Sequence, residues 1–352
     1  MSKTKVLRSL NPRLQYSFQS LPRYTHGKSQ LKYPEDCQNV INKLNIKEDY
    51  NQNHKLNIID VNPGFGLFSS MINYELQPKK HVLLEKFDEN YKNWMNRIET
   101  LKSESNNQEN FEILKNDPFD WDTYTKLFND GVIEEPNVKW DDKINDELLV
   151  LANWTGKSDE SIIAQWIGCC GNRNWLMKYG KVRMIILMPS ITAMKFLSEP
   201  GFRKRNRTSL KRDLYTKTKL IAIGEDSEIL GQGYDPRILV RDQPLVIKKN
   251  SFIRSPDVAI IEMTPGEHKS DSIANIEHLL SGIFVSSSKL KDLLPRLAPG
   301  AEYLQNYLTN ETLEKRASEF TTEDILQFSN AYEQWPFKPS TEETFDINEY
   351  DF

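Results

Sequence analysis

One stretch, residues 56–71, limits most strongly what this chain can fold into. It reads LNIIDVNPGFGLFSSM, in which a β-branched apolar run leads into a turn with Gly64 and Gly66 and then into residues suited to a helix. A short apolar run that stops at proline and glycine is typical of a buried parallel strand, and the following helix is expected to pack on it. Because glycine has no Cβ, the turn can adopt positive φ and a ligand can approach its backbone. The sequence therefore predicts an α/β fold with a ligand site at this turn.

An acidic residue near the end of the next strand-like segment strengthens this prediction. Residues 81–86 (HVLLEK) form that segment and contain Glu85. Nucleotide-type ligands bind at the carboxyl ends of parallel strands, where an acid after the second strand can accept hydrogen bonds from ribose hydroxyls. Together with Asp60, which ends the first strand, Glu85 predicts half of a nucleoside pocket. The alternative is an ordinary βαβ unit whose glutamate is solvated.

Length and composition fit one large α/β domain with a smaller second one. The 352 residues carry a net charge of −4, with 27% charged and 38% hydrophobic side chains. No apolar run approaches the roughly 18 residues of a membrane-spanning helix, so we expect no membrane partner. Cys37, Cys169 and Cys170 and the five scattered histidines lack metal-ligand spacing. We therefore expect no metal site and no disulfide scaffold, and a reducing compartment.

The first 26 residues are basic, and the first acidic residue of the chain is Glu35. An acid-free basic segment that contains serine is typical of a mitochondrial transit segment, so we expect a location in the mitochondrial matrix. The alternative is a disordered basic tail or an arm that binds nucleic acid.

The rest of the chain continues the α/β pattern and then becomes helical. We expect helices over residues 88–101, 161–171, 174–179 and 194–197, and strands over 111–114, 146–151, 182–188 and 257–263. Thr321 is the expected N-cap of the last helix, with Asp324 completing a capping-box variant. The expected parts are a basic segment (1–26), an α/β domain (27–270), a helical domain (271–336) and an acidic tail (337–352).

Two aromatic residues stand in the polar loop after the expected third strand, which reads KNDPFDW over residues 115–121. In nucleoside-binding sheets of this kind the loop covers the base, and Asp117 can accept a hydrogen bond from the amino group of that base. Phe119 and Trp121 indicate a second use, because exposed aromatic rings stack on unpaired bases at about 1–3 kcal/mol each. The alternative is that both rings anchor the loop in the core.

The glycine turn, Glu85, Asp117 and Asn153 at the end of the expected fourth strand together resemble the rRNA adenine dimethyltransferase superfamily. More closely, the chain resembles the fungal mitochondrial transcription factor B family, whose members are specificity factors of the mitochondrial RNA polymerase. The segments that carry this resemblance are 83–86, 117–121, 153–156, 180–182, 188–190 and 333–339. The resemblance implies a Rossmann-like class I methyltransferase fold with a small C-terminal helical domain. It also implies cofactor-binding positions at Leu31, Asn62, Gly64, Glu85, Asp117 and Asn153.

Two departures from the superfamily argue against catalysis. Active dimethylases end strand four in Asn-(Leu/Ile)-Pro-(Tyr/Phe), whose last ring stacks on the flipped base, whereas this chain has Asn153-Trp154-Thr155-Gly156. Asn62 replaces the first glycine of the cofactor turn, and its Cβ crowds the cofactor's approach. We therefore expect no catalytic residue, no required cofactor and a vestigial S-adenosylmethionine pocket. The alternative is an active rRNA adenine N6,N6-dimethyltransferase with an unusual strand-four motif.

A basic run follows the expected fifth strand: residues 203–219 contain eight Lys or Arg and one acid, Asp213. Basic side chains on phosphates release counterions, although they do not read sequence. We expect melted promoter DNA to be held by Phe119 and Trp121 and by the cations of the run, which are Arg203, Lys204, Arg205, Arg207, Lys211 and Arg212. The alternative is a solvated surface loop.

The expected function is a mitochondrial transcription initiation factor whose partners are the mitochondrial RNA polymerase and melted promoter DNA. The acidic tail that follows Pro336 contains five acids. It is expected either to be a disordered solubilising segment or, as the resemblance implies, to insert beside the catalytic cleft of the polymerase.

Overall fold

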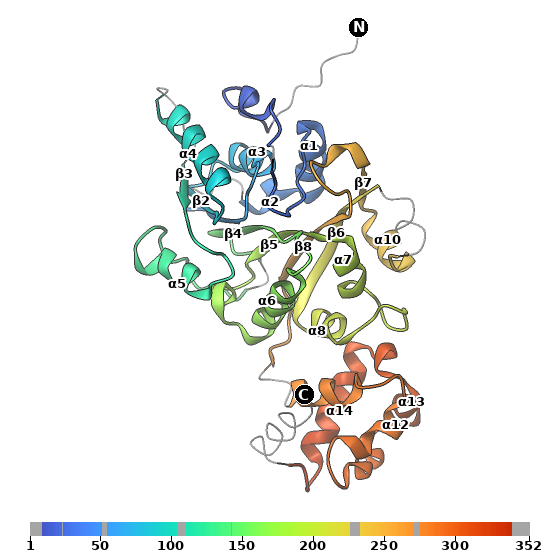
Figure 1. Cartoon of the computed structure of the whole chain (residues 1–352). Coiled ribbons are helices and arrows are strands. Elements are labelled where there is room, and N and C mark those ends of the chain that lie inside the picture. Colours follow the sequence, from blue (N-terminus) through green and yellow to red (C-terminus); the bar gives the residue numbers. More distant parts are fainter. Residues whose placement is uncertain are drawn as a thin grey trace.

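A single mixed sheet organises the molecule. The computed structural model describes residues 9–22, 24–50, 55–103, 110–141, 143–225, 233–270 and 275–339. Within these ranges an eight-stranded sheet has the order β3-β2-β1-β4-β5-β8-β6-β7, and helices cover both of its faces (Figure 1). The helices after β8 form a separate group at one end of the molecule (Figure 1). This architecture agrees with the predicted Rossmann-like fold and its helical C-terminal part.

The strands are parallel except at β8. Their bounds are β1 (Asn57–Val61), β2 (Lys80–Leu84), β3 (Phe111–Leu114), β4 (Leu148–Asn153), β5 (Arg183–Pro189), β6 (Thr216–Gly224), β7 (Leu245–Ile247) and β8 (Val258–Pro265). Strand β8 runs antiparallel to both β5 and β6. The carboxyl ends of β1, β2, β4 and β5 consequently meet at one edge of the sheet, where the sequence predicts a ligand site.

Two hydrophobic clusters cover the two faces of the sheet. Successive residues of β1 alternate between them: Ile58 belongs to one cluster, and Ile59 and Val61 belong to the other. This alternation follows from the pleat of a strand, whose side chains point to opposite faces with a period of two. The first face is covered by η1 (Gln15–Phe18), α1 (Pro34–Leu44), α2 (Ile46–Tyr50), α3 (Leu67–Leu76) and α4 (Asp88–Lys102).

The second face carries the helices of the middle of the chain and meets the C-terminal group. These helices are α5 (Trp121–Asn129), α6 (Glu160–Asn172), η2 (Trp175–Tyr179), α7 (Ser190–Phe196) and α8 (Arg207–Tyr215), with α10 (Pro236–Asp242) and η3 (Lys249–Ser251) following near β7. The C-terminal group comprises α11 (Ile276–Ile283), α12 (Leu290–Leu293), η5 (Leu294–Arg296), η6 (Ala301–Asn306), α13 (Asn310–Glu314), η7 (Ala317–Glu319) and α14 (Thr322–Gln334). Among the helices of the described ranges, none has both the length and the apolar character needed to span a bilayer.

Most predicted elements lie where the pattern places them, and the fourth strand is displaced. The structure begins β4 at Leu148 rather than at residue 146. The preceding residues are used to fix a loop instead: Asn145 donates a hydrogen bond to the Tyr179 carbonyl at 2.8 Å, and Glu147 accepts one from the Asn137 backbone at 2.9 Å. The predicted capping box of α14 is confirmed, because Thr321 N–H donates to Asp324 Oδ2 at 2.8 Å and Asp324 N–H donates to Thr321 Oγ1 at 3.2 Å.

The basic N-terminal segment is partly folded onto the first face of the sheet. Leu10, Leu14 and Phe18 are buried in the same cluster as α1 and α3. The ring of Phe18 packs edge-on against Phe65 of the glycine turn, with 5.3 Å between centroids. The disordered-tail alternative is therefore wrong for residues 9–22, while residues 1–8 lie outside the described ranges. Most of the acidic tail, residues 340–352, also lies outside them.

Candidate functional site

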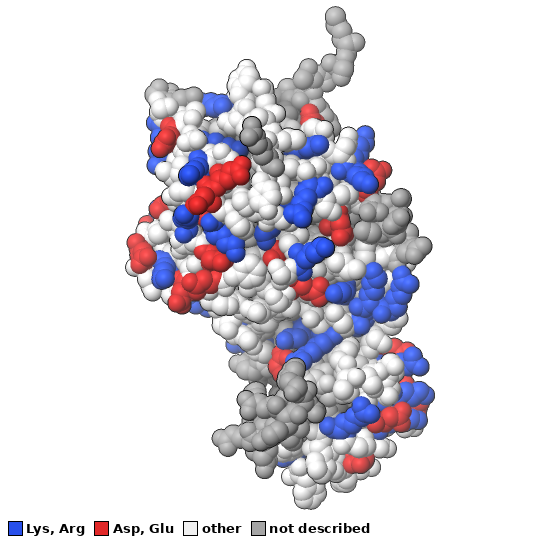
Figure 2. Space-filling view, viewed as in Figure 1, with Lys and Arg blue, Asp and Glu red and all other residues white. Residues whose placement is uncertain are grey.

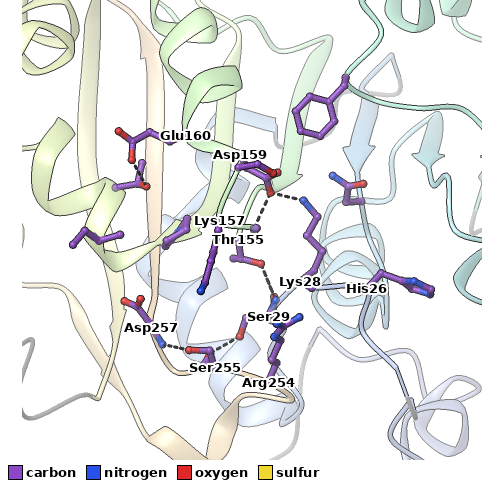
Figure 3. Close-up of a pocket in the computed structure, with 18 of the residues that line it drawn as sticks. His26, Lys28, Ser29, Thr155, Lys157, Asp159, Glu160, Arg254, Ser255 and Asp257 are labelled. Carbon is purple, nitrogen blue, oxygen red and sulfur yellow. Dashed lines mark hydrogen bonds and ion pairs between the residues drawn. The ribbon is translucent and has the colours of Figure 1, made fainter.

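An open cleft of about 820 Å³ lies at the carboxyl ends of the strands. Segments from five parts of the chain form its walls: 26–29, 86–87, 155–160, 189–195 and 254–257, with Asn62 and Phe119 between them. Lys157 and Arg254 extend toward the same space from different loops, and the side chain of Lys28 extends from the 26–29 segment to Asp159 (Figure 3). The cleft thus lies at the edge of the sheet where the sequence predicts a ligand site.

The glycine turn has the predicted left-handed backbone, but a side chain of the protein lies on it. Gly64 and Gly66 have φ of 55° and 78°, and Asn62 has φ of 54°. Gln30 Oε1 accepts a hydrogen bond from Phe65 N–H. A Cβ built on Gly64 would lie only 2.3 Å from Gln30 Nε2. The side-chain amide of Gln30 therefore lies against the backbone of the turn, at the place where the sequence predicts a ligand.

Little space remains between this turn and the end of β4. The cavity there, lined by Gln30, Leu31, Asn62 and Asn153 among others, measures about 30 Å³. A volume of this size holds roughly one water molecule. The predicted cofactor positions Leu31, Asn62 and Asn153 thus lie around one cavity, which is too small for an amino-acid-sized group, whereas Gly64 is not part of its lining.

Glu85 is buried, and both of its oxygens have donors within the protein. Oε2 accepts from Gly64 N–H at 3.2 Å and from Asn90 at 3.1 Å, and Oε1 accepts from Phe87 N–H at 3.1 Å. Burial raises the pKa of Glu85, and these hydrogen bonds together with the charge of Lys28 oppose that shift. A ribose could reach this carboxylate only by displacing donors that already satisfy it.

The side chain of Asn153, at the end of β4, is also hydrogen-bonded within the protein. Its Nδ2 donates to the Ser29 carbonyl at 3.0 Å, and its Oδ1 accepts from Thr155 Oγ1 at 2.7 Å and from Thr155 N–H at 3.3 Å. Thr155 Oγ1 in turn accepts from Ser29 N–H at 2.7 Å. Proline at position 155 would have neither the hydroxyl nor the N–H, so threonine makes this closed set of contacts possible.

The residues after Asn153 turn the loop inward. Trp154 is fully buried, with its ring edge-on to Phe119 at 4.8 Å and the Lys28 ammonium 5.0 Å from its centroid. Lys28 forms an ion pair with Asp159, whose carboxylate also accepts from Gly156 N–H at 2.8 Å. Burial lowers the pKa of Lys28, and the charge of Asp159 opposes this shift. A Cβ on Gly156 would lie 2.7 Å from Asp159 Oδ2, so the loop leaves no place for a larger residue there.

The two predicted stacking rings have different surroundings. Phe119 lines the cleft with 36% of its surface exposed, and Lys86 Nζ lies 5.3 Å from its ring. Asp117 orders this loop by accepting from Phe119 N–H at 3.1 Å and from Lys86 at 3.2 Å. The ring of Trp121 instead packs edge-on against Trp175 at 5.4 Å in the core cluster. The core-anchor alternative therefore describes Trp121, and the cleft contains Phe119.

The predicted phosphate contacts are wrong for Arg205 and Arg212, which are only 6% and 5% exposed. Arg205 donates to the carbonyls of Ser198 at 2.7 Å and of Phe320 at 2.8 Å, and Arg212 donates to that of Phe196 at 3.0 Å. Both arginines also form ion pairs with Asp213. Arg205 joins the loop before α8 to Phe320 of the C-terminal group, and Arg212 joins α8 to the end of α7. Their guanidinium groups are therefore not available to a ligand.

The other cations of the run remain near the surface, away from the cleft lining. Arg207 and Lys211 form ion pairs with Glu277 of α11, and Lys204 Nζ lies 3.2 Å from Met194 Sδ. Burial lowers the pKa of Lys204, and the charges of Arg203 and Lys195 add to that effect. Figure 2 shows a group of Lys and Arg side chains between α10 and the C-terminal helices. The prediction that Arg203, Lys204, Arg207 and Lys211 contact phosphates stays a prediction.

Sequence reasoning missed the cations that do line the cleft. Lys195 pairs with Glu160 at 3.0 Å, whereas Lys157 and Arg254 have no ion pair in the described part of the chain. Asp257 also lines the cleft, so Lys157, Arg254 and Asp257 together carry a net positive charge. Each of them is isolated in the sequence, so no local run signals them. The described residues contain no group of three or more His, Cys, Asp or Glu side chains placed to hold a metal ion.

Comparison with known proteins relates the chain to rRNA dimethylases and to yeast transcription factors. The sequence model described as "Ribosomal RNA adenine dimethylase" matches residues 21–334. "Mitochondrial transcription factor 1" of Saccharomyces cerevisiae is 30% identical over 322 residues, covering 90% of this chain and 91% of the relative. The Lachancea kluyveri protein of the same name is 27% identical over 307 residues, covering 85% and 87%.

Among solved structures, a dimethyladenosine transferase from Plasmodium falciparum superposes with a TM-score of 0.52 at 16% identity. It covers 85% of this chain and 95% of its own, which supports the fold. Because the family's sequence model extends over nearly the whole length, the chain belongs to the ribosomal RNA adenine dimethylase family, in the group that includes the yeast mitochondrial transcription factor 1 proteins.

Proposed function

We propose that this protein is a non-enzymatic transcription initiation factor of the mitochondrial matrix. It confers promoter-specific initiation on the mitochondrial RNA polymerase and helps to melt the promoter by binding separated DNA strands. The names of its relatives from two yeasts support the role in mitochondrial transcription. The cations and the exposed ring of the cleft support contact with unpaired nucleic acid.

The observation that carries the proposal is a closed methyl-transfer site beside an open cleft. Asn153, the residue that holds the adenine amino group in active dimethylases, is bound by Ser29 and Thr155. Gln30 lies on the cofactor turn, and only about 30 Å³ remains beside it. Freeing Asn153 would break three hydrogen bonds at roughly 1 kcal/mol each, before any gain from binding a base. These contacts support the loss of methyl transfer, and the open cleft beside them supports retained contact with nucleic acid.

The cleft suits a single strand better than a duplex. Phe119 offers a ring to a base, and Lys157 and Arg254 offer charges to phosphates. Stacking on an aromatic ring requires an unpaired base, whereas a duplex presents only its edges and backbone. A strand held here would be kept from pairing again, and this would lower the free energy of the melted promoter.

Run-off transcription tests the proposal directly. Linear promoter DNA is transcribed by the mitochondrial RNA polymerase with and without this protein, and a template with a preformed bubble at the start site serves as control. We expect specific transcripts from the duplex template only when the protein is present, and a smaller dependence on the preformed bubble. Equal transcript yield without the protein on the duplex would refute the function.

Methylation and cofactor binding separate the factor from the enzyme. We expect no transfer of labelled methyl groups to a small-subunit rRNA hairpin, and no calorimetric signal with S-adenosylmethionine at micromolar concentration. Methylated adenine in the hairpin together with measurable cofactor affinity would establish the dimethyltransferase alternative instead.

A further inference from the structure

A row of aromatic rings leads outward from the cleft along its N-terminal side. Tyr24 packs edge-on against His26 with 4.7 Å between centroids, and His26 stacks on Phe87 at 4.1 Å and 7°. Lys86 Nζ lies 5.5 Å from the ring of Phe87 and 5.3 Å from that of Phe119. Residues from three loops thus form one continuous row of rings and a cation, from solvent to the cleft.

A left-handed backbone turn positions His26, the residue in the middle of this row. His26 and Gly27 have φ of 50° and 82°, and this left-handed turn directs the imidazole away from the centre of the cavity (Figure 3). The His26 ring covers Phe87 there, and Tyr24 beyond it remains 61% exposed. A non-glycine residue with positive φ is uncommon and costs free energy, so the stacking has to offset that cost.

We propose that this row extends the nucleic-acid site, so that an unpaired strand in the cleft continues from Phe119 past Phe87 to Tyr24. The inference rests on the proposed function and adds a path to it. The rings belong to Tyr24, His26, Phe87 and Phe119, and the last three line the cleft. Lys157 and Arg254 line the same cleft, and a Cβ built on Gly27 would lie 3.4 Å from Arg254 Nη1. Bases stack on the rings, and phosphates contact Lys157 and Arg254 beside them.

The composition of the row favours a single strand over a protein partner. Lys86 sits over the faces of two rings, and cations interleaved with aromatic rings are typical of surfaces on which bases stack beside a charged backbone. An apolar docking patch for a protein would instead exclude charge from its centre.

Binding of thymidine oligonucleotides of about 4 and about 16 nucleotides, followed by fluorescence anisotropy, tests the path. We expect Tyr24→Ala to leave the Kd for the short strand unchanged and to raise that for the long strand by about five- to a hundredfold. Tyr24→Phe keeps the ring and should retain affinity. Tyr16→Ala is the matched control, because Tyr16 is 70% exposed on the same segment.

Three outcomes separate this inference from the function on which it rests. Wild-type affinity of Tyr24→Ala for the long strand, with Phe119→Ala weakened, would show that the strand ends in the cleft and would overturn the inference alone. Wild-type strand affinity with impaired initiation by the polymerase would assign Tyr24 to that partner and would also overturn it. Failure of the wild-type protein to bind either strand would remove both the path and the strand-binding function.

Discussion

Replacing Arg205 by methionine distinguishes a structural arginine from a DNA contact. The sequence predicts that Arg205 binds phosphate, whereas the structure places its guanidinium between the Ser198 and Phe320 carbonyls and Asp213. Methionine keeps most of the aliphatic volume and removes all three contacts. The substitution therefore tests the connection between the α/β part and the C-terminal helices.

The magnitude follows from the contacts that are lost. Removing one partner of a buried ion pair typically costs 3–5 kcal/mol, because the other charge is left uncompensated. Here Arg212 Nη1 still contacts Asp213 at 2.8 Å, so the lower end of that range applies. We expect Arg205→Met to lower the free energy of unfolding by about 3 kcal/mol. Arg207→Met, which breaks only an exposed pair with Glu277, should cost at most about 1 kcal/mol.

Urea unfolding followed by fluorescence of the seven tryptophans measures the difference. Binding of a single-stranded oligonucleotide is measured in parallel, at a urea concentration where both variants remain folded. If Arg205→Met is as stable as Arg207→Met and its DNA affinity falls, Arg205 contacts phosphate and the structural reasoning is wrong.

Two further predictions concern the cleft, and a third concerns Glu147 in the loop before β4. Phe119→Ala should raise the Kd for single-stranded DNA by about five- to a hundredfold in anisotropy, and an unchanged Kd would remove the ring from the site. Lys157→Ala should flatten the slope of log affinity against log salt by about 0.7, the effect of one phosphate; an unchanged slope would place Lys157 off the strand. Burial acts to raise the pKa of Glu147, but hydrogen bonds from Asn137 and Lys139 hold it at about 2. Because this folded-state pKa is depressed, the stability it gives is present above about pH 4.5 and is lost as the pH falls toward 2. Glu147→Gln should therefore cost about 3 kcal/mol at pH 7 and little near pH 2; an equal cost at both pH values would contradict the assignment.

The sequence was sufficient for the elements whose signal is local. The apolar run before Gly64 and the helical periodicity of residues 88–101 both depend on residues close in the sequence, and β1 and α4 lie where expected. The left-handed turn also follows from residue type, because glycine and asparagine tolerate positive φ better than other residues.

The site was less predictable, because its contacts join distant segments. A run of cations indicates a basic patch only if no acceptor folds against it, and the carbonyl of Phe320 lies 115 residues from Arg205. The contact between Gln30 and the glycine turn could not be predicted, because no pattern in the sequence around Gln30 indicates that it packs against Gly64 and Phe65. The cations Lys157 and Arg254 were missed for the same reason.

Burial of the N-terminal segment limits how the protein can mature. Leu10, Leu14 and Phe18 belong to the hydrophobic cluster on the first face of the sheet, and each apolar side chain withdrawn from water contributes about 1.5–3 kcal/mol. A processing peptidase that cut after Phe18 would remove all three and leave the helices around α3 exposed. If an import signal is trimmed from this chain, we therefore expect the cut to fall before Leu10, because a later cut would remove side chains that stabilise the folded protein.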